Sequence, residues 1–320
     1  MSEALVRMNN LVVEYPTRYG TVQAVDVSHL EIRRGEVLGL VGESGCGKST
    51  LGMALLRMVQ PPGRIGRGEV WFDGQNLMAL SEKEMRDIRG RRVSMIFQDP
   101  MTSLDPLQRI EEHLIEAVRV HDRTVSTEDI RRGIVELMDR LGIRANRLKD
   151  YPHQFSGGMR QRIMIGLALA LNADLIIADE PTTSLDVVVE AQFLDLLKEL
   201  QRELNLTILL ITHNIGIVAE LADRVAVMYA GRLVELAEAL PFFERPLHPY
   251  TQALLASVPN IKLTDDKLQI MDGSPPDLIS PPDGCRFHPR CRHVMGDICP
   301  IQDPPFKETE PGHWVACWLY

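Results

Sequence analysis

Residues 42–50 have the types and spacing of a phosphate-binding loop. They read Gly-Glu-Ser-Gly-Cys-Gly-Lys-Ser-Thr, follow the apolar run at 37–41 and precede a helical pattern at 51–59. In such a P-loop, glycines let successive backbone N–H groups turn inward around phosphates. We predict that Lys48 reaches the β- and γ-phosphates and that the Ser49 hydroxyl ligates Mg²⁺. The predicted nucleotide-contacting residues of the loop are Gly42, Ser44, Gly45, Cys46, Gly47, Lys48, Ser49 and Thr50.

A pair of carboxylates ends a buried-strand pattern at residues 175–180. Leu-Ile-Ile-Ala precedes Asp179 and Glu180, at the end of a strand where open α/β sheets place their ligands. Asp179 is placed to orient Mg²⁺ or a water bound to it, and Glu180 to polarise the water that attacks the γ-phosphate. An ordinary acidic strand end is the alternative, which the P-loop disfavours.

Between these two motifs, residues 155–161 read Phe-Ser-Gly-Gly-Met-Arg-Gln and open an apolar helical pattern at 159–171. A Gly-Gly pair alone would indicate only a turn. Here the segment offers a hydroxyl, bare backbone amides and the positive end of a helix, which are groups that grip a phosphate. The residues predicted for this role are Ser156, Gly157, Gly158 and Gln161.

The order of the three motifs resembles that of the ATP-binding subunits of ABC transporters, and the resemblance covers nearly the whole chain. It implies an α/β fold: a RecA-like P-loop nucleotide-binding domain with an antiparallel β-subdomain and a helical subdomain. It also implies that the segment at 156–158 of one subunit completes the P-loop site of another. ATP then holds two subunits together and hydrolysis releases them, so a single chain should be a poor ATPase.

Three further residues match motifs of the resembled family. Gln98, which follows an apolar strand, matches the glutamine that senses Mg²⁺ and links the site to the membrane partner. His213, one strand beyond the acidic pair, matches the switch histidine that contacts the γ-phosphate. Asp186, in Ser-Leu-Asp, matches the D-loop aspartate that works across the dimer interface. Without the family's order of motifs, each would be an ordinary polar residue.

The adenine platform needs only an aromatic face on a loop near the base. Tyr15 ends a strand pattern at 11–15 that aligns best with the family's first strand, and we prefer it. Tyr19 is the rival, and a packing role for either tyrosine is an equal alternative.

The composition of the chain changes near residue 240. Residues 1–240 are predicted to form the ABC ATP-binding domain, with its helical subdomain at about 99–166, where helical patterns cover 110–120 and 127–141. Residues 241–320 form an extension rich in proline, with four of the five cysteines.

Two runs in the extension, at 245–255 and 273–276, resemble the end of oligopeptide and dipeptide permease ATPases. The run at 98–106 resembles the D-type member of the paired ATPases in those systems, which implies a heterodimer with a related F-type subunit; a homodimer is the alternative.

The cysteines of the extension are spaced C-x5-C-x7-C-x17-C, at Cys285, Cys291, Cys299 and Cys317. Four thiols in one segment of a cytoplasmic protein favour a metal site over disulfides, and the spacing is not that of a zinc ribbon. The resembled subfamily implies a [4Fe–4S] cluster that staples the tail, with zinc and then free thiols as alternatives. Cys46, in the P-loop, is expected to be structural, although its alkylation should block ATP binding.

The composition fits a globular ATPase. The 320 residues are 45% hydrophobic and 25% charged, which is ordinary for a protein with a substantial core. The net charge of −9 argues against a nucleic-acid partner. No apolar run approaches the ~18 residues of a membrane span, and the first residues lack a signal-peptide pattern. We therefore expect a peripheral position on the cytoplasmic face of a prokaryotic inner membrane.

These observations favour an ATP-hydrolysing subunit that energises an importer of di- or oligopeptides. Its partners would be a second ATPase, two integral membrane permease subunits and, through the complex, an external solute-binding protein. Importers of cello- or xylo-oligosaccharides, nickel chelates or glutathione are the alternatives, because the ATPase never needs to touch the solute. A regulatory ABC ATPase without a transport role is the alternative from another class.

Overall fold

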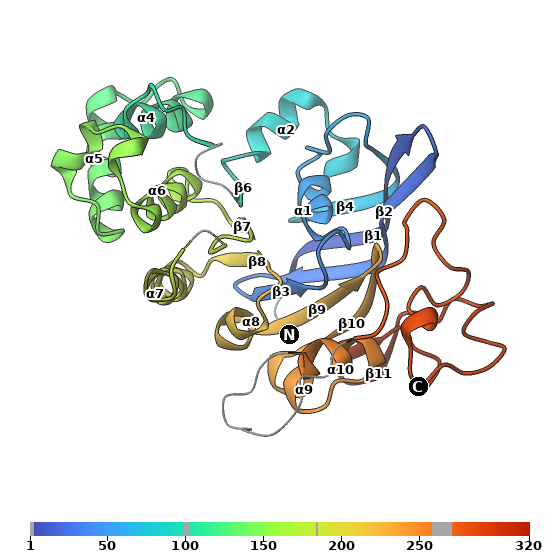
Figure 1. Ribbon diagram of the computed structural model, residues 1–320. Helices are drawn as coiled ribbons and strands as arrows, with labels where there is room; N and C mark the ends of the chain where they lie inside the picture. The colour runs from blue at the N-terminus through green and yellow to red at the C-terminus, as the bar shows by residue number, and fades with distance from the viewer. Residues whose placement is uncertain (1–2, 99–102, 184, 258–270) are drawn as a thin grey trace. The chain divides into compact units, whose positions relative to one another are not determined.

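The computed structural model describes residues 3–98, 103–183, 185–257 and 271–320. These residues fold into two compact units. The first comprises Met1–Ala79 and Leu210–Tyr320, and the second comprises Leu80–Leu209. Figure 1 labels the helices and strands of both.

An antiparallel sheet forms one part of the first unit, in the strand order β2-β1-β4-β5. Its strands are β1 (Ala4–Thr17), β2 (Gly20–Arg33), β4 (Arg64–Phe72) and β5 (Gln75–Asn76). The two long strands β1 and β2 form a hairpin that pairs from Ala4 opposite Arg33 to Thr17 opposite Gly20. This sheet matches the antiparallel β-subdomain that the resemblance implies.

The second sheet of this unit carries the P-loop. Its strand order is β11-β12-β10-β9-β3, followed by β8. The bounds are β3 (Val37–Val41), β8 (Thr207–Ile211), β9 (Arg224–Tyr229), β10 (Arg232–Glu238), β11 (Lys307–Glu310) and β12 (His313–Val315). Strands β3 and β9 are parallel and buried along their whole length, as expected of strands covered on both faces. The edge strand β11 and its neighbour β12 come from the extension, so the tail continues the sheet of the ATP-binding region.

Short helices complete the first unit. They are α1 (Lys48–Leu55), η1 (Leu77–Ala79), α8 (Ile215–Leu221), α9 (Ala239–Glu244), α10 (Pro249–Ala256) and η4 (His288–Arg290). Helices α9 and α10 follow β10 and lie beside it in Figure 1. Between strand and tail, Tyr229, Tyr250 and Phe287 form a buried aromatic cluster with ring centroids 4.6–5.4 Å apart.

The second unit is mostly helical. It contains α2 (Glu82–Ile88), β6 (Val93–Ile96), α4 (Ile110–His121), α5 (Thr127–Arg140), η2 (Ala145–Lys149), η3 (Pro152–Gln154), α6 (Gly157–Leu169), β7 (Leu175–Asp179) and α7 (Val187–Leu204). Strands β6 and β7 are parallel neighbours. Helix α5 is capped by Ser126, whose hydroxyl accepts a hydrogen bond from the Asp129 N–H. Helix α6 packs closely on α5, because a Cβ at Gly166 would lie 2.6 Å from Met138 Sδ.

The helical patterns read from the sequence find these helices but misplace some starts. Helices α4 and α5 agree with the predicted ranges 110–120 and 127–141 to within one residue at each end. Helix α1 begins at Lys48 rather than at 51, and α6 at Gly157 rather than at 159. In both cases glycine and polar residues occupy the first turn, where apolar periodicity gives no signal.

A buried polar network joins the extension to β10. The Glu235 carboxylate, fully buried, accepts hydrogen bonds from the N–H groups of Leu247 (2.7 Å) and His248 (2.9 Å), and His313 Nε2 lies 2.7 Å from it. His248 Nδ1 in turn accepts from the Tyr250 N–H at 3.0 Å and caps α10. The start of α10 is therefore held by the side chains of Glu235 and His248, which are buried away from water.

We expect the burial of His248 to make stability depend on pH. Burial lowers the pKa of this imidazole from 6.5 to about 4, so the folded protein keeps it neutral while the unfolded chain protonates near pH 6.5. The contribution of neutral His248 to the free energy of unfolding is complete above pH 6.5. It falls by about 3 kcal/mol as the pH drops to 4. Urea denaturation at pH 7 and pH 4.5 should show a smaller loss for His248→Asn, which retains a capping side chain. Equal losses in the two proteins would contradict this origin.

Candidate nucleotide-binding site

The P-loop runs from the end of β3 to the start of α1, and its glycines are required by space. Gly42 and Gly47 have φ values of +153° and +105°. A Cβ at Gly42 would lie 2.1 Å from the Met228 carbonyl oxygen, and one at Gly47 equally close to that of Ala24. Only glycine allows the loop to approach the neighbouring backbone so closely.

Lys48 is the first residue of α1 and is only 6% exposed. Its Nζ donates hydrogen bonds to the carbonyl oxygens of Gly42 at 2.8 Å and Glu43 at 3.0 Å. The ammonium is therefore held inside the loop, next to the positive N-terminus of a helix. This combination is suited to binding an anion. Ser49 follows in the same helical turn.

Cys46 contributes a buried thiol to the loop, and its Sγ lies 3.8 Å from Lys48 Nζ. Burial raises the pKa of this thiol above its usual value of 9. A buried, protonated thiol reacts slowly, so we expect alkylation of Cys46 to be slow.

The first unit also places His213 and the two candidate tyrosines. His213 is exposed and follows β8, where the Thr212 N–H donates to the Leu40 carbonyl of β3 at 3.2 Å. Tyr15 is half-buried against Gly63, where a Cβ would lie 2.4 Å from its ring. Tyr19 lies in the β1–β2 turn and is 88% exposed. Tyr15 thus has a packing role, whichever ring stacks on adenine.

In the second unit, the acidic pair ends β7. Asp179 is buried, whereas Glu180 is half-buried and has a φ of +49°. A residue with a side chain is costly in this left-handed conformation, and such strain concentrates at functional sites. The Thr183 hydroxyl donates to Glu180 Oε2 at 2.8 Å and orients it. Sequence reasoning missed Thr183, although its place three residues after a strand-end glutamate suits such a bond.

The segment predicted to grip phosphate lies at the N-terminus of α6, as the motif requires. Ser156 is the N-cap and accepts a hydrogen bond from the Met159 N–H at 3.4 Å. Gly158 allows close packing on α7, because a Cβ there would lie 2.3 Å from Val189 Cγ1.

Gln161, which is also predicted to contact the nucleotide of a partner subunit, is 0% exposed. Its Nε2 donates to the Pro181 carbonyl at 2.6 Å, and its Oε1 lacks a partner among the described residues. Gln161 therefore joins α6 to the segment after Glu180.

Asp186 and Gln98 are the remaining predicted site residues of the second unit. Asp186 is exposed and caps α7, accepting from the Val189 N–H at 3.0 Å. Gln98 is exposed just after β6. Residues 99–102, which belong to the run predicted to be D-type, lie outside the described residues, as does residue 184 before the D-loop aspartate.

The extension contacts the P-loop directly at Glu43. Arg290 donates to both carboxylate oxygens, with Nη1–Oε2 at 2.8 Å and Nη2–Oε1 at 3.0 Å. The Glu43 N–H donates to the Tyr250 hydroxyl at 2.9 Å. The bond to Glu43 raises the pKa of Arg290, and burial raises that of Tyr250 well beyond its usual value of 10. Sequence reasoning gave no role to Glu43 or Arg290.

Comparisons with known proteins agree with the predicted family. A family model described as ABC transporter matches residues 25–183, and one described as the C-terminal region of oligopeptide/dipeptide transporters matches 234–299. The chain is 45% identical to a dipeptide transport ATP-binding protein of Bacillus subtilis, covering 99% of this chain and 95% of the relative. The chain belongs to the ATP-binding subunits of ABC transporters.

Two further comparisons extend the relationship. The oligopeptide transport ATP-binding protein AppF of Bacillus subtilis is 43% identical, covering 96% of this chain and 92% of that protein. An ATP-binding cassette solved as a dimer in a post-hydrolysis state, bound to ADP and phosphate, has a TM-score of 0.66 and 27% identity, covering 73% of this chain and 98% of that one. The predicted ABC fold and ATP-hydrolysing activity are confirmed.

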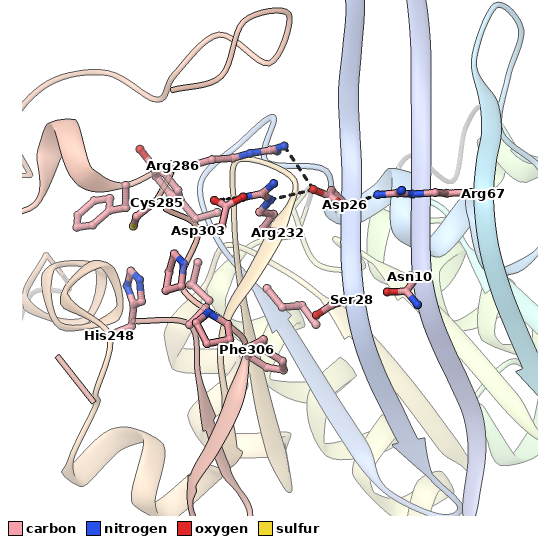
Figure 2. Close-up of a pocket in the computed structure, with 17 residues that line it drawn as sticks. Asn10, Asp26, Ser28, Arg67, Arg232, His248, Cys285, Arg286, Asp303 and Phe306 are labelled. Atoms are coloured by element: carbon pink, nitrogen blue, oxygen red, sulfur yellow. Dashed lines mark hydrogen bonds and ion pairs between the residues drawn. The ribbon is translucent and has the colours of Figure 1, made fainter. Parts of the chain in front are cut away.

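This ABC ATPase also has a cavity of about 270 Å³ between β2 and the extension. Figure 2 shows Asp26 reached by Arg232 and Arg286 from one side and by Arg67 from the other. The nitrogen–oxygen distances are 2.9, 3.6 and 4.0 Å respectively. The charges in this cavity are paired with one another, and they join the extension to the β-subdomain.

The four cysteines of the extension are free thiols. Burial, together with the charges of the other three, raises the pKa of Cys285 to about 11. A backbone hydrogen bond links two of these cysteines, since the Cys285 N–H donates to the Cys299 carbonyl at 2.8 Å. Among the described residues, no group of three or more His, Cys, Asp or Glu is arranged to hold a metal ion. The chemistry of the donor set suits a metal, whereas the positions of the thiols do not form a metal site.

In the described parts of this ABC ATPase, none of the helices combines the length and apolar character needed to cross a membrane.

Proposed function

We propose that this ABC ATPase energises the import of di- or oligopeptides. The observation that carries the proposal is the extension itself, matched by the oligopeptide/dipeptide transporter model over residues 234–299. Its His-Pro-Tyr segment, residues 248–250, provides the hydroxyl that binds the P-loop at Glu43. The relatives named for dipeptide and oligopeptide transport support the same solute class.

The proposed roles follow the chemistry of each side chain. Lys48 binds the β- and γ-phosphates, and Ser49, Gln98 and Asp179 serve Mg²⁺, which neutralises developing charge on the phosphates. Glu180 accepts a proton from the attacking water. His213 contacts the γ-phosphate and Tyr15 stacks on adenine. Ser156, Gly157 and Gly158 of one subunit act on the ATP of its partner, with Asp186 at the dimer interface.

The proposed assembly pairs this D-type chain with an F-type ATPase on the cytoplasmic face of the inner membrane. Two integral permease subunits carry the solute, which an external binding protein delivers. The similarity of this chain to AppF supports a related second ATPase as the partner. Affinity-tagged chain purified from membranes should retain the second ATPase and the permease subunits. Recovery of the chain alone would favour the non-transport alternative.

The solute is tested by uptake. A strain lacking this chain should lose accumulation of a labelled dipeptide or tetrapeptide, and regain it with the wild-type chain but not with Glu180→Gln. Labelled xylo- and cello-oligosaccharides, nickel chelates and glutathione serve as parallel solutes. Loss of one of these with peptide uptake retained would assign the chain to that alternative.

We also infer a [4Fe–4S] cluster at Cys285, Cys291, Cys299 and Cys317, with zinc as the alternative. The four free thiols of one extension support it, and binding requires the thiols to lose their protons and to close around the metal. The cluster would staple the tail.

Anaerobically purified protein should then contain about four iron atoms per chain, and Cys291→Ser should lose most of them, because one of four ligands is gone. Metal analysis checks this, with Cys46→Ser as the matched control that keeps its iron. Zinc in place of iron would select the alternative, and equal iron in both variants would reject a site at Cys291.

A further inference from the structure

Every polar group of Glu43 in the P-loop is held. Its N–H donates to Tyr250, its carbonyl accepts from Lys48 Nζ, and both carboxylate oxygens accept from Arg290. Arg290 is only 6% exposed, and the Glu43 side chain 27%. Arg290 is itself fixed, because its Nε donates to the Asp272 carbonyl at 3.0 Å and its Nη1 lies 3.3 Å from the Tyr229 hydroxyl.

A second arginine of the same tail segment reaches the other side of the loop. Arg286 donates to the Ala230 carbonyl and, at 2.9 Å, to Gln23 Oε1. Gly231, which follows Ala230, donates its N–H to the Cys46 carbonyl of the P-loop at 2.9 Å. Gly231 has a φ of +85°, and a Cβ there would lie 3.1 Å from the Arg286 guanidinium. Glycine therefore makes room for the arginine.

The segment that carries the two arginines is anchored by a buried ring. It reads Cys-Arg-Phe-His-Pro-Arg-Cys at 285–291 and forms the turn η4. Phe287, 2% exposed, packs on Tyr229 and Tyr250 with ring centroids 5.1 and 5.4 Å away. Both arginines thus project from a buried anchor.

We propose that the tail segment 285–291 positions the P-loop for nucleotide binding, through Arg290 on Glu43 and Arg286 on the Ala230–Gly231 turn. A carboxylate in a phosphate-binding loop opposes an incoming polyphosphate unless it is neutralised, and Arg290 supplies that neutralising charge. A loop held in its binding shape also loses less entropy when ATP arrives. The inference rests on the proposed nucleotide site, and it makes Arg290 a positioning residue rather than a catalytic one.

The test compares two arginines of one segment. Arg290→Gln in the full-length chain should raise the Kd for a non-hydrolysable ATP analogue roughly tenfold, because the Glu43 carboxylate is left unpaired. Arg292→Gln is the matched control, since Arg292 pairs with Asp272 at the surface, where the two side chains are 63% and 81% exposed; its Kd should not change. In the assembled complex, KM for ATP should rise and kcat should stay within about twofold.

Two further variants separate positioning from mere folding. Arg290→Lys keeps the charge but not the two-pronged bond, and its Kd should rise about threefold. If Arg290→Gln does not fold, the Kd of Arg290→Lys tests the inference in its place. Glu43→Gln combined with Arg290→Gln removes both charges, and should return the Kd to within about threefold of wild type.

Equal Kd values for Arg290→Gln and Arg292→Gln would overturn the inference, as would a double variant whose loss is the product of the single losses. Lys48→Ala distinguishes this failure from failure of the nucleotide site. If Lys48→Ala strongly weakens binding while Arg290→Gln has no effect, only the inference falls. If neither affects binding, the site itself is wrongly placed.

Discussion

In a complex whose partner ATPase is catalytically disabled, Glu180→Gln is expected to leave ATP binding intact and to lower ATP turnover by roughly 10²–10⁴-fold, the range for loss of a general base. The amide keeps the size of the side chain and can still bond to Thr183, but it cannot take a proton from water. The left-handed backbone at Glu180 and the hydrogen bond from Thr183 hold this carboxylate in one orientation, as expected of a functional residue.

The measurement is steady-state ATP hydrolysis by the complex, with nucleotide binding to the same variant. Glu203→Gln, an exposed acid near the end of α7, is the matched control and should hydrolyse ATP like the wild type. If Glu180→Gln kept full turnover while the partner ATPase was catalytically disabled, Glu180 would lose its assigned role.

Lys48→Ala should instead weaken binding of ATP itself, by roughly 10²-fold. The ammonium supplies charge-assisted hydrogen bonds to phosphate, each contributing about 1.5–3 kcal/mol. It also bonds to two carbonyls of its own loop, so its loss loosens the empty loop as well. Equilibrium binding of a fluorescent ATP analogue checks this.

The control for Lys48→Ala is Lys83→Ala, which removes an exposed lysine from α2 and should bind the analogue normally. Nearly unchanged affinity in Lys48→Ala would show that the P-loop does not carry the phosphates.

The motifs were predictable from sequence because phosphate chemistry restricts residue types at close spacing. A lysine and a hydroxyl after three glycines, or two acids after a buried strand, leave few other interpretations. The glycine positions are explained locally too, since Gly42 and Gly47 have neighbours that exclude any Cβ.

Contacts between distant residues could not be read in this way. Arg290 and Glu43 are separated by 247 positions, and Glu235 and His313 by 78, so no local pattern announces either pair. The fully buried position of Gln161 depends on how α6 packs beside Pro181. The four cysteines show a further limit of sequence patterns. Their spacing predicts a shared site, but the positions of the sulfur atoms decide whether a metal fits.

The most direct test of the account is ATP hydrolysis by the complete complex in lipid vesicles, with its solute-binding protein. Hydrolysis should rise when a di- or oligopeptide is added, stay at the basal rate with oligosaccharides or nickel chelates, and vanish when both ATPases carry the substitution equivalent to Glu180→Gln. Stimulation by a sugar or chelate, with none by peptides, would contradict the assignment of this chain to peptide import.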